Sequence, residues 1–342
     1  MVLVIGGSMK KALTLIIWLS WFIVMPLSAE VLKGYENYQI IKPLEIPGED
    51  GTLILSNSPE TVTRQGILYR ENLVGHGRLV FHHVNATSKE DQRLVIIIKN
   101  LTPCEQRFEV NKEGYATPHY HYLEAGNTLL NAYYQCYTSR TFFLEPNAEM
   151  VLYDSSPFVW KNQMVLSGML DVYATGKVEI MFAMIGKQDS ISKVNHLKVL
   201  ETDSAPRGTF NGLTKYQYVV LPKGQNTYYL IEDSKDGWLR GIDYSTGKPA
   251  INYGNYGVLY KIKLIAKEDM KVFICPRGGI FQGTVRWDNG ETYLIERKHV
   301  FKEIKERIPI GVIKSGETRT LEYMLPNGSA APVLLGFDII NE

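Results

Sequence analysis

The sequence predicts an all-β protein that follows an N-terminal export leader. Apolar runs and alternating apolar and polar positions recur at the length of strands, and turn residues separate them at short intervals. Helical periodicity is weak along the chain. We therefore predict two tandem antiparallel β-sandwich domains, Ig-like or jelly-roll-like, at 36–200 and 206–342.

Three segments show the strand signals well. Leu94–Ile98 is a continuous apolar run, and Val178–Ile185 is similar apart from Glu179; such runs are typical of strands buried on both faces. In Tyr256–Ile265, Lys261 and Lys263 alternate with apolar residues, which predicts a strand with one face in water. The turn signals between strands are Asn57-Ser58-Pro59, Pro146-Asn147, Pro222-Lys223-Gly224, Asp236-Gly237, Asn289-Gly290, Lys314-Ser315-Gly316 and Pro326-Asn327-Gly328.

One pattern of strand, tight turn and strand occurs three times, at 142–152, 218–231 and 310–323, and we predict a β-hairpin at each. Thr128–Tyr137 predicts a short crossing helix. Glu296–Arg307 has a thin apolar stripe, and we interpret it as a strand or loop.

The first 29 residues have the three parts of a secretory signal peptide. Lys10 and Lys11 precede an apolar stretch, Ala12–Met25, and cleavage is expected after Ala29. The apolar run is shorter than the roughly 20 residues that a membrane-spanning helix needs, although an uncleaved anchor is the alternative. Met9 competes with Met1 as the start of the chain. The expected location is secreted, periplasmic or at the cell surface, with no membrane association after cleavage.

The polar segment 201–208 contains Pro206 and Gly208 and is the best candidate for a linker between the two domains. The totals of 37 Lys and Arg against 36 Asp and Glu give a net charge of +1, which argues against a nucleic-acid partner.

The chain has three cysteines, so at least one of them has no intramolecular partner. A disulfide between Cys104 and Cys136 is one interpretation. The pattern favours the other, in which Cys104, Cys136 and Cys275 are small buried apolar residues.

Several motifs resemble a family of exported bacterial proteins. They are Ser56–Glu60 with Gly66–Tyr69, Gly77–Asn85, Gly254–Tyr260, Arg277–Gly283 and Leu325–Val333. The family is a domain of unknown function, best populated in cyanobacteria, with relatives among Gram-positive secreted proteins labelled copper amine oxidase-like. That label comes from a separate stalk domain, so the resemblance implies export and fold but no activity.

A histidine-rich stretch raises the possibility of a metal site. His119 and His121 would share one face of a strand, and Glu124 with one of His82 or His83 would complete a set of ligands for Zn, Fe or Mn. His82 and His83 are adjacent in sequence and would point to opposite faces, so only one of them could take part. Structural histidines are the interpretation that the pattern favours.

Two further groups are candidates for ligand binding. Asn255, Tyr256 and Arg277 lie in the glycine-rich motifs, although glycines that permit positive φ or close packing explain these motifs better. Exposed tyrosines stack on sugar rings, and Tyr120 and Tyr122 are the chosen candidates. They belong to a crowded set, Tyr115, Tyr120, Tyr122, Tyr133, Tyr134 and Tyr137, for which packing in the core is the alternative.

No Gly-x-Ser-x-Gly elbow and no other readable catalytic set occurs in the sequence. The sequence therefore favours a non-enzymatic structural or binding protein of the cell envelope or extracellular space. Its expected partners are polysaccharides or envelope proteins, and no cofactor is expected. A metal-dependent enzyme or metal-binding protein that uses the histidines is the alternative. The ligand and the oligomeric state are not readable from the sequence.

Overall fold

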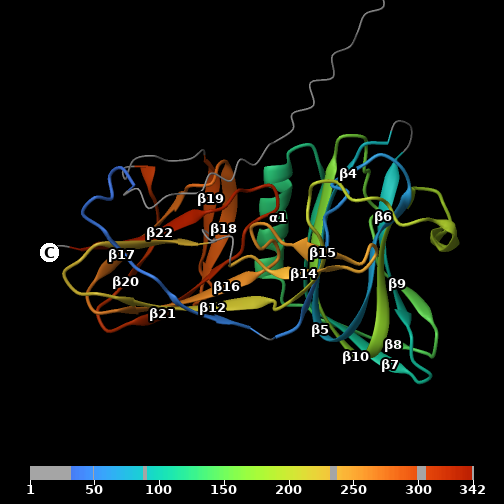
Figure 1. Ribbon diagram of the computed structural model, residues 1–342, viewed down its shortest axis with the longest axis horizontal. Helices are drawn as coiled ribbons and strands as arrows, with labels where there is room; N and C mark the ends of the chain where they lie inside the picture. The colour runs from blue at the N-terminus through green and yellow to red at the C-terminus, as the bar shows by residue number, and fades with distance from the viewer. Residues whose placement is uncertain (1–31, 49, 88–90, 232–236, 299–305, 341–342) are drawn as a thin grey trace, which may run out of the picture. The chain divides into compact units, whose positions relative to one another are not determined.

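The computed structural model describes residues 32–48, 50–87, 91–231, 237–298 and 306–340 (Figure 1). The predicted leader, 1–29, lies outside these residues. The fold is all-β as predicted, and the helical elements in the described ranges are α1 (Tyr122–Gln135) and the short 3-10 helix η1 (Ile191–His196). None of the described helices is long and apolar enough to cross a membrane. The predicted helix at Thr128–Tyr137 corresponds to α1, which begins six residues earlier.

The largest sheet has eleven strands and is built on two long antiparallel strands, β5 (Gly66–Asn85) and β10 (Val165–Gly186). Its other strands are β3 (Thr52–Ser56), β4 (Thr61–Val62), β6 (Gln92–Asn100), β7 (Gln106–His119), β8 (Arg140–Leu144), β9 (Glu149–Asp154), β11 (Arg207–Asn211), β14 (Arg240–Asp243) and β15 (Lys248–Ile251).

This sheet folds over on itself and forms both layers of a sandwich. The register of β5 and β10 is interrupted between Ala174 and Val178, opposite Gly75, whose φ is 77°. β6 pairs with one half of β10, and β7 pairs with the other half. The rings of Phe81 and Phe182 lie 6.4 Å apart, although the two residues occupy opposite halves of the long strands. Strands on either side of the bend therefore bury their apolar faces against each other.

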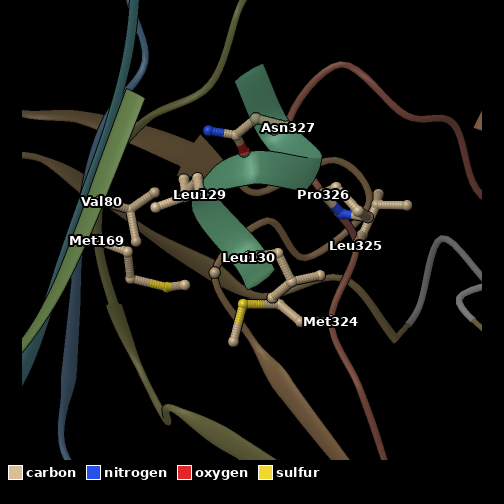
Figure 2. A pocket seen from close by; sticks show the side chains of 10 residues that line it. Val80, Leu129, Leu130, Met169, Met324, Leu325, Pro326 and Asn327 are labelled. Atoms are coloured by element: carbon tan, nitrogen blue, oxygen red, sulfur yellow. The ribbon is translucent and has the colours of Figure 1, made fainter. Parts of the chain in front are cut away.

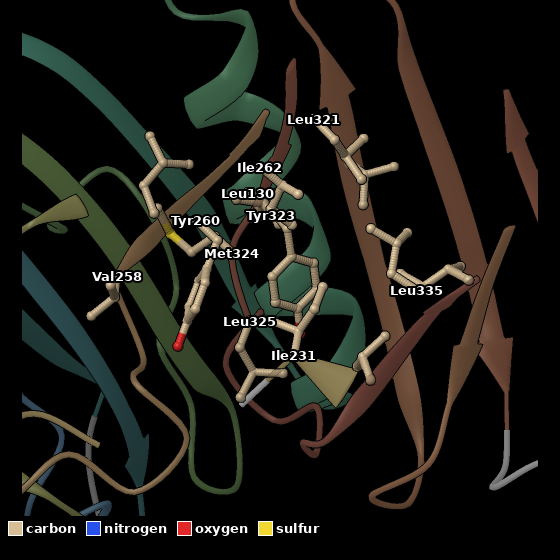
Figure 3. Packing of buried hydrophobic residues seen from close by; sticks show 14 of the residues in the cluster. Leu130, Ile231, Val258, Tyr260, Ile262, Leu321, Tyr323, Met324, Leu325 and Leu335 are labelled. Carbon is tan, nitrogen blue, oxygen red and sulfur yellow. The ribbon is translucent and has the colours of Figure 1, made fainter. Parts of the chain in front are cut away.

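Two further sheets pack face to face. The first has five strands, β1 (Gln39–Ile40), β13 (Thr227–Ile231), β22 (Val333–Ile339), β17 (Met270–Pro276) and β20 (Ile308–Ile313). The second has six strands, β19 (Thr292–Lys298), β18 (Phe281–Trp287), β21 (Thr318–Tyr323), β16 (Leu259–Ala266), β12 (Thr214–Leu221) and β2 (Leu44–Pro47). Figure 3 shows Ile231 and Leu335 of the first sheet in one cluster with Ile262 and Leu321 of the second. Leu130 of α1 joins the same cluster, so the helix extends this core toward the bent sheet.

The chain crosses the predicted domain boundary in both directions. β1 and β2 precede the bent sheet in sequence but belong to the paired sheets, while β11 pairs with β3 of the bent sheet and brings β14 and β15 with it. The described residues from Leu32 onward form one compact unit. The predicted division at 200–206 therefore does not coincide with the borders of the sheets, because strand pairing joins segments from both sides of it.

The three predicted hairpins are wrong in their pairing, although their strands are present. β8 pairs with β7 and β9 with β6, so the turn between them crosses the bent-sheet sandwich. β12 and β13 belong to different sheets, and so do β20 and β21. When a turn crosses from one layer to the other, the strands before and after it both bury one face in the core between the layers. Each strand then alternates apolar and polar residues, as it would in a hairpin, so the sequence does not distinguish the two arrangements.

Candidate ligand-binding surface

His82 and His83 lie inside the bent sheet and point to opposite faces, as their adjacency predicts. Nδ1 of His82 lies 2.6 Å from the hydroxyl of Ser167. Nε2 of His83 lies 3.0 Å from the hydroxyl of Ser56, and its Nδ1 lies 2.8 Å from the carbonyl of Pro59. Burial lowers the pKa of His82 to about 3 and that of His83 to about 4. Both imidazoles are therefore neutral, hydrogen-bonded parts of the core.

His119, His121 and Glu124 lie instead at an exposed turn. β7 ends at His119 and α1 begins at Tyr122, so the two histidines do not share one face of a strand. Nε2 of His119 is 3.3 Å from Oε2 of Glu124, and Nδ1 of His119 accepts a hydrogen bond from the N–H of His121. Throughout the described ranges, no three His, Cys, Asp or Glu side chains are placed to hold a metal ion. The predicted set of ligands is not assembled, because His82 and His83 are both fixed in the core, away from the exposed turn.

Tyr120 and Tyr122 are exposed beside these histidines, with 57% and 48% of their surfaces in contact with solvent. We call residues 119–122 the aromatic ridge. Tyr122 is supported from behind by Gly328, where an added Cβ would lie 2.5 Å from Cδ2 of the tyrosine. Of the other tyrosines in the crowded set, Tyr137 is exposed, whereas Tyr115, Tyr133 and Tyr134 pack against the interior. The turn thus holds two tyrosines toward solvent on a fixed backbone.

The segment 326–332 brings together motifs that are far apart in the sequence. Tyr256 donates a hydrogen bond from its hydroxyl to the carbonyl of Ser329. The backbone N–H of Arg277 donates to the carbonyl of Pro332. Tyr122 contacts Gly328 of the same segment. Three of the predicted ligand-binding residues, Tyr122, Tyr256 and Arg277, are therefore neighbours of one loop.

Asn255 has a structural role instead. It is fully buried with a φ of 53°, its amide oxygen accepts from the N–H of Leu239, and its amide nitrogen donates to the hydroxyl of Tyr260. Gly257 has a φ of 79°, and a Cβ there would lie 2.8 Å from Cγ2 of Val80. The predicted positive φ and close packing of this motif are confirmed.

The three cysteines are free. Cys104 precedes the first residue of β7, whereas the backbone of Glu113, near the middle of that strand, bonds the thiol of Cys136. Each residue of an extended strand advances the chain by about 3.3 Å, so the two thiols are too far apart for a disulfide. The favoured interpretation, in which all three are small buried residues, holds for Cys275 but is wrong for Cys104, which is exposed, and for Cys136, which is half-buried.

A small cavity lies between α1, the bent sheet and the loop 324–327 (Figure 2). Its volume is about 10 Å³, and its lining includes Leu129, Leu130, Val80, Met169 and Asn327. This volume corresponds to a single water molecule, so no substrate enters here.

A cluster of charges that the sequence did not reveal lies at the last turns of α1. Arg78 donates from Nε and Nη2 to the carboxylate of Asp171, and the hydroxyl of Tyr133 donates to the same carboxylate. Arg286 of β18 donates to the carboxylate of Glu322 of β21, and both strands belong to the six-stranded sheet. Lys112 is near enough to interact electrostatically with both pairs. We call Arg78, Lys112, Asp171, Arg286 and Glu322 the Lys112 cluster.

Cross-strand pairing brings the cluster together. Arg78 pairs with Asp171, and Asp171 pairs with Lys112, in one row across β5, β10 and β7. An arginine inside the otherwise apolar run 77–81 was the one available signal in the sequence.

No family model and no curated protein matches this chain.

Proposed function

We propose that this is an exported, non-enzymatic envelope or extracellular protein that binds polysaccharide through the aromatic ridge. Export is proposed from the leader in the sequence. The observation that carries the binding proposal is the exposure of Tyr120 and Tyr122 on a turn that packing and hydrogen bonds hold in place.

The chemistry of the ridge suits a sugar. A tyrosine ring covers the apolar face of a pyranose while its hydroxyl bonds the polar rim. His121 and Glu124 add polar groups beside the two rings. Because Tyr122 is supported by Gly328 and the ring of His119 is bonded to the backbone, little conformational entropy remains to be lost on binding.

Binding of the purified protein to insoluble cell-wall and extracellular polysaccharides tests the proposal. We expect retention of the wild type on at least one polymer, and a loss of about tenfold or more in affinity for Tyr120→Ala with Tyr122→Ala. Tyr137→Ala is the matched control, because this tyrosine is 85% exposed at the other end of α1. Wild-type protein that is retained on no polymer would overturn the proposal, and so would equal losses in the ridge and control variants.

A further inference from the structure

Lys112 is a half-buried lysine held over aromatic rings. Its ammonium lies 4.3 Å from the centroid of the Tyr133 ring and 5.7 Å from that of Tyr134. Burial lowers the pKa of Lys112, and the nearby charge of Arg286 lowers it further. Within the described part of the chain, its ammonium has no hydrogen-bonded or ion-paired carboxylate.

The carboxylates near Lys112 are already engaged by other groups. Asp171 accepts two hydrogen bonds from Arg78 and one from Tyr133. Glu322 is paired with Arg286 at 2.8 Å. A third carboxylate, Asp50, also acts on Arg78 but is bonded to the N–H groups of Leu213 and Thr214. Lys112 is therefore the cation of the Lys112 cluster that no described carboxylate bonds. A partly desolvated charge without a partner is unfavourable, so it is expected to have a use.

The cluster is open to water on one side. The side chain of Asp171 is 25% exposed and that of Arg286 is 21% exposed, while Lys112 is half-buried. A ligand group can therefore approach from solvent and still meet the cations where water screens them only in part, which strengthens a charge-assisted hydrogen bond.

We propose that the Lys112 cluster binds one singly charged oxyanion group. Lys112 and Arg286 are the donors, and the rings of Tyr133 and Tyr134 position the ammonium. The oxyanion supplies the bonded negative partner that the Lys112 ammonium lacks among the described residues. This step rests on the proposed function: if the protein binds polysaccharide, the oxyanion group is a carboxylate or a sulfate ester of an acidic polysaccharide.

The position of the cluster on α1 agrees with a polymeric ligand. Tyr122 of the ridge and Tyr133 of the cluster are eleven residues apart in this helix. Eleven residues make about three helical turns and a rise of about 17 Å, so the two positions lie on one face of the helix. Tyr133 itself is buried, so an extended oligosaccharide would span that distance from the exposed ring of Tyr122 to the open side of the Lys112 cluster.

Paired polymers that differ only in charge test the inference. Polygalacturonate is compared with its methyl ester, and dextran sulfate with dextran. We expect the wild type to prefer the acidic member of at least one pair, and Lys112→Gln to weaken that binding by about tenfold or more while leaving the neutral member unaffected. Lys112→Arg should retain the preference.

Lys263→Gln is the matched control, because its ammonium lies 5.9 Å from the Tyr218 ring on an open sheet face. Equal binding of acidic and neutral polymers, or acidic binding that Lys112→Gln leaves unchanged, would overturn the inference.

A second measurement separates this inference from the proposed function. Acylation of each lysine by acetic anhydride is followed by mass spectrometry, with and without glucuronate. Glucuronate should protect Lys112 and leave Lys263 unprotected. Protection without retention on any polymer would support the anion site and contradict the proposed function. Retention on neutral polymers through the ridge, without protection, would contradict the anion site and support the function.

Discussion

Two buried arginines, Arg78 and Arg207, each bond the part of the chain before residue 201 to the part after residue 206, but they do so in different surroundings. Arg207 donates to Asp243 and, through Nη1, to the carbonyls of Ser58, Leu68 and Leu200. Its side chain is 0% exposed, and that of Asp243 is 6% exposed. It is a closed site in which the guanidinium and the carboxylate serve only the fold.

Arg78 also bonds backbone carbonyls from distant segments, those of Leu213 and Gly257. Its carboxylate partner, Asp171, is 25% exposed, and a second cation, Lys112, lies beside the pair. Arg207 is thus sealed from water together with its carboxylate. Arg78 shares a partly exposed carboxylate with a neighbouring lysine, and this open arrangement is the one that we propose for an anionic ligand.

Replacement of Arg207 by Met should have the largest effect on stability. It leaves Asp243 buried and uncompensated, and the expected loss is about 3–5 kcal/mol in the free energy of unfolding. Urea denaturation measures the loss, and Asp243→Asn in the same chain should restore part of it. A loss below about 1 kcal/mol, as at an ordinary surface position, would contradict the closed-site interpretation.

Replacement of Arg78 by Met should cost less, about 2–3 kcal/mol, because water can solvate the exposed side of Asp171 and Lys112 can supply a counter-charge. The same denaturation series measures it. If Arg78→Met destabilised the protein more than Arg207→Met, the distinction between an open and a closed site would be lost.

The open site should also respond to acid through Asp171. Burial raises the pKa of this carboxyl, but the charge of Arg78 and hydrogen bonds from Arg78 and Tyr133 outweigh it, so the pKa lies below its usual 3.8. A carboxyl whose folded pKa is depressed stabilises the fold above its unfolded pKa, and this stability is lost as the pH falls through the folded value.

We therefore expect wild type and Asp171→Asn to differ by about 1–2 kcal/mol at pH 7 and to converge as the pH falls below 4. Urea midpoints between pH 7 and pH 3 measure this difference. If the urea midpoints of wild type and Asp171→Asn differed by the same amount at every pH in this range, the pairing of Arg78 with Asp171 would not act through the ionised carboxylate.

The smallest effect is expected for Lys112→Met. The substitution removes cation–π contacts but also removes a half-buried charge that lacks a carboxylate, so the protein should keep its stability or gain up to about 1 kcal/mol. Thermal denaturation without added ligand measures it, with Lys263→Met as the exposed counterpart. A clear loss of stability would mean that Lys112 is a structural cation like Arg78.

The sequence predicted those features that depend on neighbouring residues. Alternation in Tyr256–Ile265 predicted a strand with one wet face, and β16 has this arrangement, with Lys263 exposed and Ile262 buried. The adjacency of His82 and His83 predicted their opposite orientations. Most of the described strand pairs are antiparallel as predicted. Four are parallel: β1 with β13, β3 with β5, β4 with β5, and β12 with β16.

The features that sequence reasoning missed depend on residues that are distant along the chain. The carbonyl of Gly257 lies 179 positions from Arg78, and Asp243 lies 36 positions from Arg207. No local pattern indicates which carboxylate or carbonyl such an arginine meets. The same reason explains the false hairpins, since a turn of a given sequence does not specify whether its two strands pair or cross between layers.

The exchange of strands across residues 200–206 has a consequence for how this protein can be divided. A recombination break in that segment would leave one product without β1 and β2, and the other without β11, β14 and β15. Each product would then expose an unpaired strand edge to aggregation. Fusion proteins and chimeras should therefore keep the three sheets together in one piece, even though the sequence predicts two domains in tandem.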